Sequence, residues 1–330
     1  MTDRYVAAHQ SPEGPGDSRP TARQIILDEG LENRWPEKTI LITGCSAGIG
    51  KETAKALYST GATLYLTARN LAKARVALGD IAHSNRVHLL QLNLGSLASV
   101  RSCAEYFLSK NEKLHILICN AGMMDPMPGK THDGFEVHFG TNHLSHFLLF
   151  NLLKPALQSA ASPDFASRVI IVSSVAHRFF NFNLEDVEKE TFNGMIAYGG
   201  SKLCNSWTAN EIERRFGQDG IHAWSVHPGS VSTELARNLP EDERNVQQTN
   251  PIMRKITKTS EQGASTVVWG ATASALEGKG GGYLEDAQIS EEWDPAAGQF
   301  SNGYSSQCLD ASKAEEMWRR SLHWVGLESS

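Results

Sequence analysis

Tyr198 and Lys202 stand four positions apart in a stretch whose spacing predicts a helix over 196–216. Both side chains should therefore project from one face of that helix. Tyrosine can donate a proton, and a neighbouring ammonium favours the phenolate and lowers the phenol pKa from its usual value of about 10. Ser174 follows a predicted strand over 168–173, so its hydroxyl could hold a carbonyl oxygen while negative charge develops. The three residues together predict protonation of an alkoxide.

A glycine cluster supplies the second chemical signal. Gly44, Gly48 and Gly50 follow a β-branched apolar run over 39–43 and open a predicted helix over 49–60. Glycines at such a turn let backbone N–H groups approach a pyrophosphate, and the helix N-terminus favours an anion. Three glycines alone are weak evidence, but their position between a strand and a helix predicts a dinucleotide site.

The end of the second predicted strand, over 62–67, bears on the choice of nucleotide. An NAD site usually has Asp or Glu there to hold the ribose hydroxyls. This chain instead continues with Ala68, Arg69 and Asn70. A guanidinium can bind a 2′-phosphate, so Arg69 favours NADP over NAD. The competing interpretation is an exposed arginine with no ligand.

The elements that must position these residues alternate between strands and helices. Most of the strands are apolar on both faces, which indicates a parallel sheet covered on both sides, and hence an α/β doubly wound fold. The predicted strands are 39–43, 62–67, 87–92, 114–119, 168–173, 221–226 and 280–284. The predicted helices are 49–60, 71–82, 97–110, 135–157, 196–216 and 311–325.

The chain shows no linker-like break between residues 38 and 290, and we expect one Rossmann-type domain over 38–330. Residues 1–37 form an extension in which 1–20, rich in Pro, Gly and Ser, are expected to be disordered and 22–29 to form a helix. Residues 234–262 are polar and interrupt the alternation after the last core strand. Such a segment predicts a substrate lid or, equally, a solvated surface excursion.

Composition excludes several classes of protein. The chain has 330 residues and a net charge of −6, which argues against a nucleic-acid surface. No apolar run approaches the roughly 20 residues that span a bilayer. Five scattered cysteines without a CxxC pair fit reduced thiols, and no signal peptide is evident, so a cytoplasmic location is expected.

The motifs together resemble the short-chain dehydrogenase/reductase family over roughly 38–290. Those that carry the resemblance are Thr43-Gly44-xxx-Gly48-x-Gly50, Asn120-Ala121-Gly122, Ser174, Tyr198-xxx-Lys202 and Pro228-Gly229-x-Val231-x-Thr233. The wordings Cys-Asn-Ala-Gly and Val-Ser-Ser-x-Ala-His are similar to the retinol-dehydrogenase-like branch. The lead over 24–30 resembles fungal dehydrogenases of secondary metabolism.

The resemblance implies a role for each matching residue. Ser174, chosen over Ser173 by the family pattern, Tyr198 and Lys202 would be catalytic, and Asn142 would hold a water that links the lysine to solvent. Arg69 would bind the 2′-phosphate of NADP(H). The remaining cofactor contacts would be Gly44, Ser46, Ala47, Gly48, Ile49, Gly50, Asn93, Leu94, Asn120, Ala121, Gly122, Tyr198, Lys202, Pro228, Gly229, Val231 and Thr233. Family members are often dimers or tetramers, so a homodimer or homotetramer is expected.

The substrate side is apolar in sequence. The insert between Ser174 and Tyr198 carries Phe179, Phe180, Phe182, Phe192 and Met195, which favours a hydrophobic carbonyl compound. The histidines at 132, 138, 143 and 146 lack carboxylate or cysteine partners at ligand spacing, so no metal site is expected. Two other functions stay open, a non-redox isomerase, dehydratase or cyclase, and a nucleotide-binding regulatory protein. Dependence of turnover on nicotinamide separates them from a redox enzyme.

Overall fold

The computed structural model describes residues 4–180, 182–189 and 192–327 and confirms the predicted doubly wound sheet. Its eight strands lie in the order β3-β2-β1-β4-β5-β6-β7-β8. All neighbours pair in parallel except β7 and β8, which are antiparallel. The strands are β1 Thr39–Thr43, β2 Thr63–Ala68, β3 Val87–Gln91, β4 Ile116–Cys119, β5 Ser167–Val172, β6 Ile221–His227, β7 Tyr283–Glu285 and β8 Gln288–Ile289.

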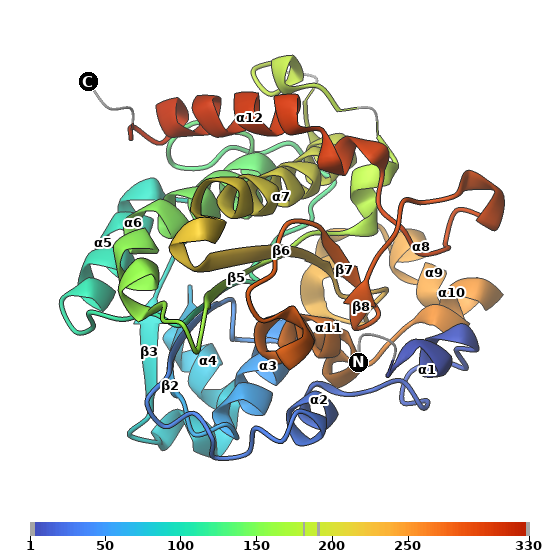
Figure 1. The fold of residues 1–330 in the computed structure, drawn as a ribbon. Helices are drawn as coiled ribbons and strands as arrows, with labels where there is room; N and C mark the ends of the chain where they lie inside the picture. The colour runs from blue at the N-terminus through green and yellow to red at the C-terminus, as the bar shows by residue number, and fades with distance from the viewer. Residues whose placement is uncertain (1–3, 181, 190–191, 328–330) are drawn as a thin grey trace.

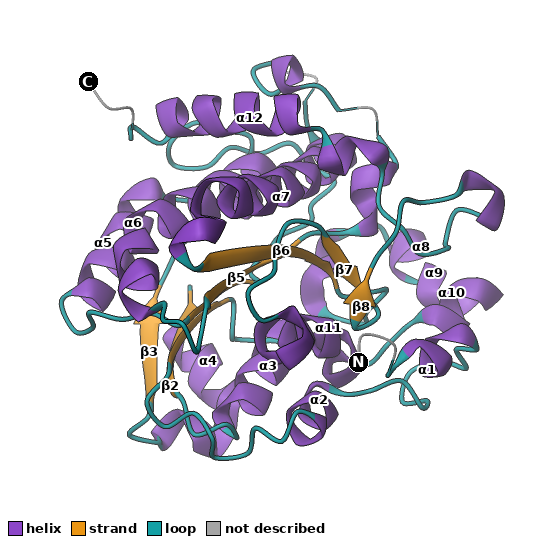
Figure 2. Ribbon diagram, viewed as in Figure 1, coloured by secondary structure: helices purple, strands orange, loops and turns teal. Residues whose placement is uncertain are grey.

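Helices cover both faces of this sheet (Figures 1 and 2). One layer consists of α5 Leu97–Leu108, α6 Ser145–Ala160, α7 Gly194–Phe216 and α12 Ala311–Trp324. The other consists of α2 Ala22–Asp28, α3 Gly48–Tyr58, α4 Leu71–Leu78 and α11 Ser260–Thr272. Four short helices lie beyond the β7–β8 end of the sheet, at the right of Figure 1. They are α1 Val6–Gln10, α8 Glu241–Arg244, α9 Val246–Thr249 and α10 Pro251–Ile256.

The central strands divide their side chains between two apolar cores. Leu41 of β1 and Leu117 of β4 enter the core beneath α5, α6 and α7. Their neighbours Ile40, Ile42 and Ile118 enter the core beneath α3 and α11. Successive strand residues point to opposite faces, so a strand between two helical layers must be apolar throughout. This is why the unbroken apolar runs predicted a parallel sheet.

The N-terminal extension differs from its prediction. The helix expected over 22–29 is present as α2, but the described residues 4–20 lie against the domain, where a disordered arm was expected. Tyr5 and Arg19 are both buried, with 7% and 4% of their surface exposed. The Tyr5 hydroxyl donates to the Asp28 carboxylate over 2.9 Å. The prolines and glycines of this arm form turns, and buried polar contacts hold these turns against the domain. Residues 1–3 lie outside the described part.

Two further elements depart from the sequence prediction. Residues 260–262, assigned to the polar segment 234–262, form the first turn of α11, a helix that the alternation did not reveal. Thr259 caps α11 by a reciprocal pair of hydrogen bonds with Gln262. The predicted helix 135–157 begins later, as a π-helical stretch Phe139–Leu144 that continues into α6. No helix among the described residues is long and apolar enough to cross a bilayer.

Candidate active site

The structure brings Ser174, Tyr198 and Lys202 together at the carboxyl end of β5. The Ser174 hydroxyl lies close enough to that of Tyr198 to lower the pKa of the Tyr198 phenol. Lys202 follows one turn later on α7, with its ammonium 5.8 Å from the Tyr198 ring centroid. The same ammonium donates to the carbonyl of Val172, the last residue of β5, over 3.0 Å. One strand end and one helix turn therefore fix all three side chains.

The neighbouring serine has a different role. The Ser173 hydroxyl is buried and donates to the Lys202 carbonyl over 2.7 Å, so it fastens α7 to β5. Ser174 is partly exposed, and its oxygen accepts from the backbone N–H of Ala176 over 3.2 Å. The two serines thus have different surroundings, and the catalytic role of Ser174 stays a prediction.

Burial dominates the protonation of this group. It raises the pKa of Tyr198 above its ordinary value, and the nearby Ser174 hydroxyl opposes the rise. Burial also lowers the pKa of Lys202 to about 8. The sequence argument expected the ammonium to lower the tyrosine pKa. Burial raises that pKa instead, because loss of water disfavours the phenolate, and the group that opposes the rise is Ser174.

Asn142 lies in the π-helical stretch before α6 and is fully buried. Its side-chain oxygen accepts from the Met123 backbone N–H over 2.9 Å, and its amide nitrogen donates to the Met123 carbonyl and the Ser201 hydroxyl over 3.1 Å each. Ser201 precedes Lys202, so Asn142 ties the chain after β4 to α7 beside the lysine. A π-helical turn at such a point is frequent at functional sites.

The sequence analysis missed Thr43 and His146 as supports of this site. The Thr43 hydroxyl oxygen accepts from the backbone N–H groups of Asn120 and Ala121, each over 3.0 Å. His146 Nδ1 lies 3.0 Å from the Asn142 carbonyl, and its Nε2 lies 2.9 Å from the Thr43 hydroxyl. Burial lowers the His146 pKa to about 4. The neutral ring then donates through Nδ1 to Asn142 and accepts from Thr43, linking the glycine loop to the Asn142 turn.

Two other histidines of this stretch, His138 and His143, are also engaged in packing and hydrogen bonds, whereas His132 is exposed. His138 Nε2 accepts from the backbone N–H of Asp125 over 2.9 Å, and His143 Nε2 lies 2.9 Å from the Ser321 hydroxyl. Both are fully or almost fully buried. Their burial agrees with the interpretation of these histidines as packing residues.

The glycine loop brings α3 unusually close to β1 and β4. A Cβ atom on Gly50 would lie 2.3 Å from the Gly44 carbonyl oxygen and 2.4 Å from Asn120 Nδ2. Gly44 has φ +78°, and a Cβ there would meet Ala121 at 2.9 Å. Helix α3 begins at Gly48 after Ala47, whose side chain cannot cap it. Its first N–H groups are therefore available to an anion.

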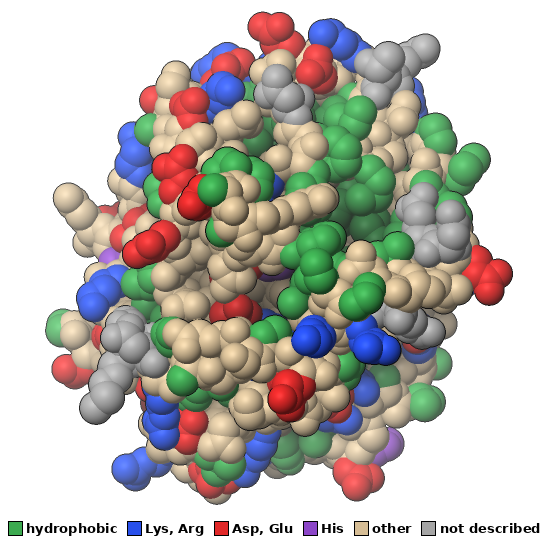
Figure 3. Space-filling model, turned by 90° about the vertical axis from the view of Figure 1, so that its right-hand side faces the viewer, with side chains coloured by type: hydrophobic (Ala, Val, Ile, Leu, Met, Phe, Trp, Pro, Cys, Tyr) green, Lys and Arg blue, Asp and Glu red, His purple; other side chains and the backbone are tan. Residues whose placement is uncertain are grey.

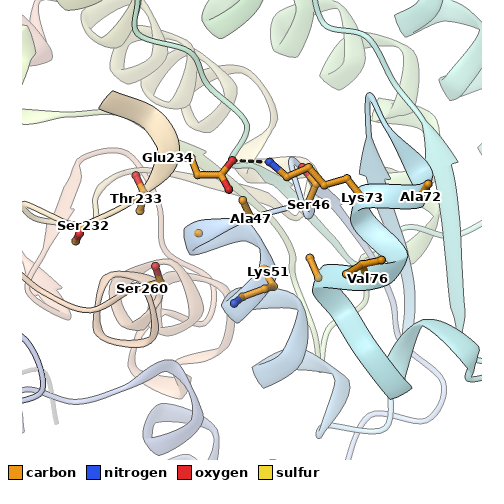
Figure 4. A pocket seen from close by; sticks show the side chains of 12 residues that line it. Ser46, Ala47, Lys51, Ala72, Lys73, Val76, Ser232, Thr233, Glu234 and Ser260 are labelled. Carbon is orange, nitrogen blue, oxygen red and sulfur yellow. Dashed lines mark hydrogen bonds and ion pairs between the residues drawn. The ribbon is translucent and has the colours of Figure 1, made fainter. Parts of the chain in front are cut away.

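A groove of about 750 Å³ opens beside this loop (Figure 4). Of the predicted cofactor residues, Ser46, Ala47, Gly48 and Thr233 line it. Other lining residues were not predicted, and these include Lys51, Lys73, Val76, Glu234 and Ser260. Lys73 and Glu234 form an ion pair across the groove, as Figure 4 shows. Lys73 follows Arg69 by four positions and lies in the first turn of α4, a nearness in sequence that could have identified it.

Several predicted adenosine contacts lie elsewhere. Arg69 is exposed at the end of β2 and does not line the groove. Asn93 is partly exposed, and its side-chain oxygen accepts from the Gly95 backbone N–H over 3.1 Å. Leu94 is 8% exposed and belongs to the core beneath α5. Packing in the core therefore accounts for most of the Leu94 side chain.

The turn after β6 carries the predicted nicotinamide contacts. Gly229 has φ +93°, and a Cβ there would lie 2.9 Å from the Lys258 side chain. Val231 pairs with Lys258 in a parallel bridge. A Cβ on Gly48 would meet the Thr233 side chain at 3.2 Å, so this turn closes over the glycine loop. The predicted residues Pro228, Gly229, Val231 and Thr233 thus border the site on the side opposite β2.

The aromatic residues of the 175–197 insert divide into two groups. Phe182 and Phe192 are buried, pack against each other and belong to the core. Phe180 is partly exposed and lies against Gly199, where a Cβ would approach its ring to 2.7 Å. Phe179 has 42% of its surface exposed and follows the turn that carries Ser174. Only the second pair lies at the edge of the site.

The fold and the site define the class of protein. The sequence model described as short chain dehydrogenase matches residues 38–244, which holds every predicted site residue. The chain belongs to this family.

Particular relatives agree with that assignment. The chain is 39% identical over 325 residues to the short-chain dehydrogenase/reductase prx1 of Penicillium roqueforti, covering 98% of this chain and 95% of that protein. It is 36% identical over 297 residues to retinol dehydrogenase 12 of Mus musculus, covering 89% and 88%. An uncharacterized protein from Mycobacterium paratuberculosis has a similar crystal structure, with TM-score 0.68, 28% identity, and coverage of 91% and 97%. The expected resemblance to fungal and retinol-dehydrogenase-like members is confirmed.

The close approach of α3 to the sheet makes a first prediction. Gly50→Ala should lower the free energy of unfolding by about 1–3 kcal/mol, because backbone and anchored amide atoms must shift to admit the methyl group. The same shift should weaken nucleotide binding. Thermal unfolding and a fluorescence titration with NADPH would measure both effects. Gly129→Ala is the control, since its Cβ would meet nothing nearer than 3.4 Å. Equal stability of the two variants would contradict the prediction.

Proposed function

We propose that the protein is an NADP(H)-dependent oxidoreductase that interconverts a hydrophobic ketone or aldehyde and its alcohol. The observation that carries this proposal is the convergence of the Ser174 and Tyr198 hydroxyls, which interact, with the Lys202 ammonium 5.8 Å from the Tyr198 ring centroid. A hydroxyl pair and a cation at one strand end can hold and protonate a carbonyl oxygen.

The glycine loop supports nucleotide binding on its own geometry. Gly44, Gly48 and Gly50 allow the loop to pack so closely that a Cβ would collide with or crowd neighbouring protein atoms, and the uncapped start of α3 faces the groove. A bound nicotinamide would supply the hydride, which is the part of the chemistry that side chains cannot perform. Ser46, Ala47 and the first N–H groups of α3 would hold the pyrophosphate. Thr233 would close the groove from the opposite side.

The side chains themselves would move one proton. Burial raises the Tyr198 pKa, so the phenol is protonated at neutral pH, as a proton donor to an alkoxide must be. Ser174 would hold the carbonyl oxygen through its hydroxyl, and Lys202 would place a positive charge near the tyrosine. Asn142 would fix the segment beside the lysine through its bonds to Met123 and Ser201.

Exposed apolar side chains near the site support a hydrophobic substrate. Phe179 is 42% exposed and Phe300 39%. The Arg178 guanidinium, next to Phe179 in the chain, donates to the carbonyls of residues 299, 301 and 303 around Phe300. Ile196, two residues before Tyr198, is 45% exposed. Figure 3 shows hydrophobic side chains gathered on the side of the molecule on which α8–α10 lie. Because Arg178 is engaged by backbone carbonyls, it is poorly suited to bind a substrate carboxylate.

The segment 234–257 fits a substrate lid. Its helices α8, α9 and α10 are short, and the described residues of α10 include none that is fully buried. Such a segment can open at low cost because it contributes little to the core. A cytoplasmic location, a role in secondary metabolism and a homodimeric or homotetrameric assembly stay predictions from the sequence.

A titration with NADPH and NADH, followed by turnover of hydrophobic ketones, tests the proposal. Tighter binding of NADPH and ketone-dependent oxidation of NADPH are expected. Turnover of a substrate without any dependence on nicotinamide would favour a non-redox isomerase, dehydratase or cyclase. Nucleotide binding without turnover would favour a regulatory protein.

The proton donor can be tested by Tyr198→Phe. Loss of the hydroxyl should lower the reduction rate by about 10²–10⁴-fold, the usual contribution of general acid catalysis. Binding of NADPH should stay close to that of the wild type. Tyr106→Phe is a matched control, because Tyr106 is 51% exposed on α5. Undiminished turnover by Tyr198→Phe would contradict the assignment.

Nucleotide preference can be tested by Arg69→Ala. Loss of a charge-assisted hydrogen bond to the 2′-phosphate, worth about 1.5–3 kcal/mol, should weaken NADPH by at least about tenfold. NADH lacks that phosphate, so its affinity should change little. Arg75→Ala removes an exposed charge from the same region, on α4, and serves as the control. Equal weakening of both nucleotides by Arg69→Ala would show that Arg69 is no phosphate ligand.

The pKa of Lys202, which burial lowers to about 8, makes a prediction about pH. The ammonium form is present below that pKa and is lost as the pH rises through it. The rate of ketone reduction should therefore fall above about pH 8, since the positive charge beside Tyr198 disappears. In Lys202→Arg the guanidinium stays charged, so any residual rate should be flat over the same range. A wild-type rate that holds constant well above pH 8 would contradict the prediction.

A further inference from the structure

The N-terminal segment 4–20 reaches the end of α10 through one buried arginine. Arg19 is 4% exposed, and its guanidinium donates to the carbonyls of Ile256 and Thr257, each over 2.7 Å. A third carbonyl, that of Gly14 in the same arm, accepts over 3.0 Å. Arginine is suited to this task because its planar fork presents five donors in fixed directions. The residues that it joins lie more than 230 positions apart in the sequence.

The positive charge of Arg19 is compensated within the same contact. Asp17 accepts from Arg19 Nε over 2.8 Å, and this contact helps lower the Asp17 pKa to about 2. Gln262 in the first turn of α11 donates to the Asp17 carboxylate over 3.0 Å and accepts from the Gly16 backbone N–H over 3.0 Å. The arm is therefore fastened both to the end of α10 and to the start of α11.

The carbonyls that Arg19 binds stand where the segment 234–257 rejoins the domain. The last carbonyls of a helix have no partner within the helix, and a cation there is favourable. Arg19 supplies donors and charge at the end of α10. The next residue, Lys258, is the point at which the chain re-enters the core. The position of Lys258 therefore depends on where the carbonyls of residues 256 and 257 are held.

Lys258 in turn supports the turn after β6. Its backbone N–H donates to the Ser230 carbonyl over 2.8 Å, and the Ser232 N–H donates to the Lys258 carbonyl over 3.3 Å. Its buried ammonium donates to the Asp286 carboxylate over 2.6 Å and to the Pro228 carbonyl over 3.4 Å. A single residue thus holds both ends of the turn that faces the glycine loop.

The arm reaches this network at a second point. His9 on α1 has its Nε2 3.6 Å from the Asp286 carboxylate oxygen that also binds Lys258. The groups around Asp286 are His9, Lys258 and the side-chain amide of Asn302, which donates to its other oxygen over 2.7 Å. Segments from the beginning, the middle and the end of the chain therefore meet behind the Pro228 turn.

We propose that residues 4–19 are a positioning element of the active site, with Arg19 as its principal positioning residue. Arg19 fixes the carbonyls of residues 256 and 257, these fix Lys258, and Lys258 fixes the turn 228–232. The consequence for catalysis rests on the proposed function, in which that turn borders the nicotinamide. Arg19 touches neither substrate nor cofactor in this arrangement, so its effect is on binding and on the mobility of the segment 234–257.

Arg19→Ala tests the proposal by a readout that does not depend on turnover. Hydrogen exchange of backbone amides in peptides covering 230–234 and 251–258 should become at least about tenfold faster, because local opening loses its main restraint. Peptides from β4 and β5 should exchange as in the wild type. Arg23→Ala is the matched control, since Arg23 on α2 is exposed and pairs with Glu32 and Ser59 at the surface. Unchanged exchange at 251–258 would overturn the proposal.

Kinetics of ketone reduction give the second arm of the test. In Arg19→Ala the KM for NADPH should rise by about tenfold while kcat stays within about twofold, because the Ser174, Tyr198 and Lys202 geometry is intact. Ethylguanidinium added to this variant should restore much of the lost affinity. Equal losses in KM and kcat without rescue would show a general structural defect and would overturn the positioning role.

Arg19→Lys keeps the test decisive if the alanine variant does not fold. Lysine retains the charge but cannot bridge two carbonyls of the helix end and the Gly14 carbonyl at once. It should give exchange at 251–258 between that of the wild type and a fully released segment, and identity with the wild type would overturn the proposal. A protein that shows the exchange effect but reduces no ketone would refute the proposed function and leave the arm's positioning role standing.

Discussion

The burial of the Lys202 ammonium against the end of β5 is the constraint on which the site depends. A charged amine costs several kcal/mol to remove from water unless polar groups meet it. Here the Val172 carbonyl accepts one of its protons, and the same carbonyl also accepts from Asn205 of α7 over 3.1 Å. The Ser173 hydroxyl binds the Lys202 carbonyl. These hydrogen bonds hold α7 against the end of β5, one helical turn after Tyr198.

The hydrogen bonds between β5 and α7 also constrain the elements around them. Tyr198 can meet Ser174 only if α7 lies at a fixed height above β5, and a strand buried on both faces provides a rigid base. Thr43 at the end of β1 holds the chain just after β4 in a similar way, because its hydroxyl accepts hydrogen bonds from the N–H groups of Asn120 and Ala121. The glycine loop and the Asn142 turn beside α7 therefore belong to one polar network that His146 completes.

The sequence predicted this part well because its determinants are local. Strand–glycine–helix order, tyrosine and lysine one turn apart, and serine at a strand end are each visible in a short window. Their convergence follows from the rule that parallel strands end at one edge of the sheet. The direction of the Tyr198 pKa was not predictable in the same way. It depends on how much water the fold removes from the phenol, which no spacing expresses.

Longer-range features escaped sequence analysis for related reasons. Helix α11 is buried on nearly every side and rich in small residues, so it shows no amphipathic pattern, and the Thr259 and Gln262 capping box was its one local signal. The arm 4–20 has the composition of a disordered segment. Its order comes from Arg19 and from partners more than 230 residues away.

Helix α11 and the arm 4–20 lie against each other, and together they bear on how a substrate could reach the site. Tyr198 and Lys202 are 5% and 3% exposed, so a substrate needs some neighbouring element to yield. The core strands and α7 are too deeply buried to do so at low cost. The segment 234–257 has short helices and few buried side chains, and Arg19 and Gln262 fasten the arm to the chain around its end. In the proposed function, the segment 234–257 would then be a loosely packed cover with a firmly anchored return at Lys258, able to move while the Pro228 turn keeps its place against the glycine loop.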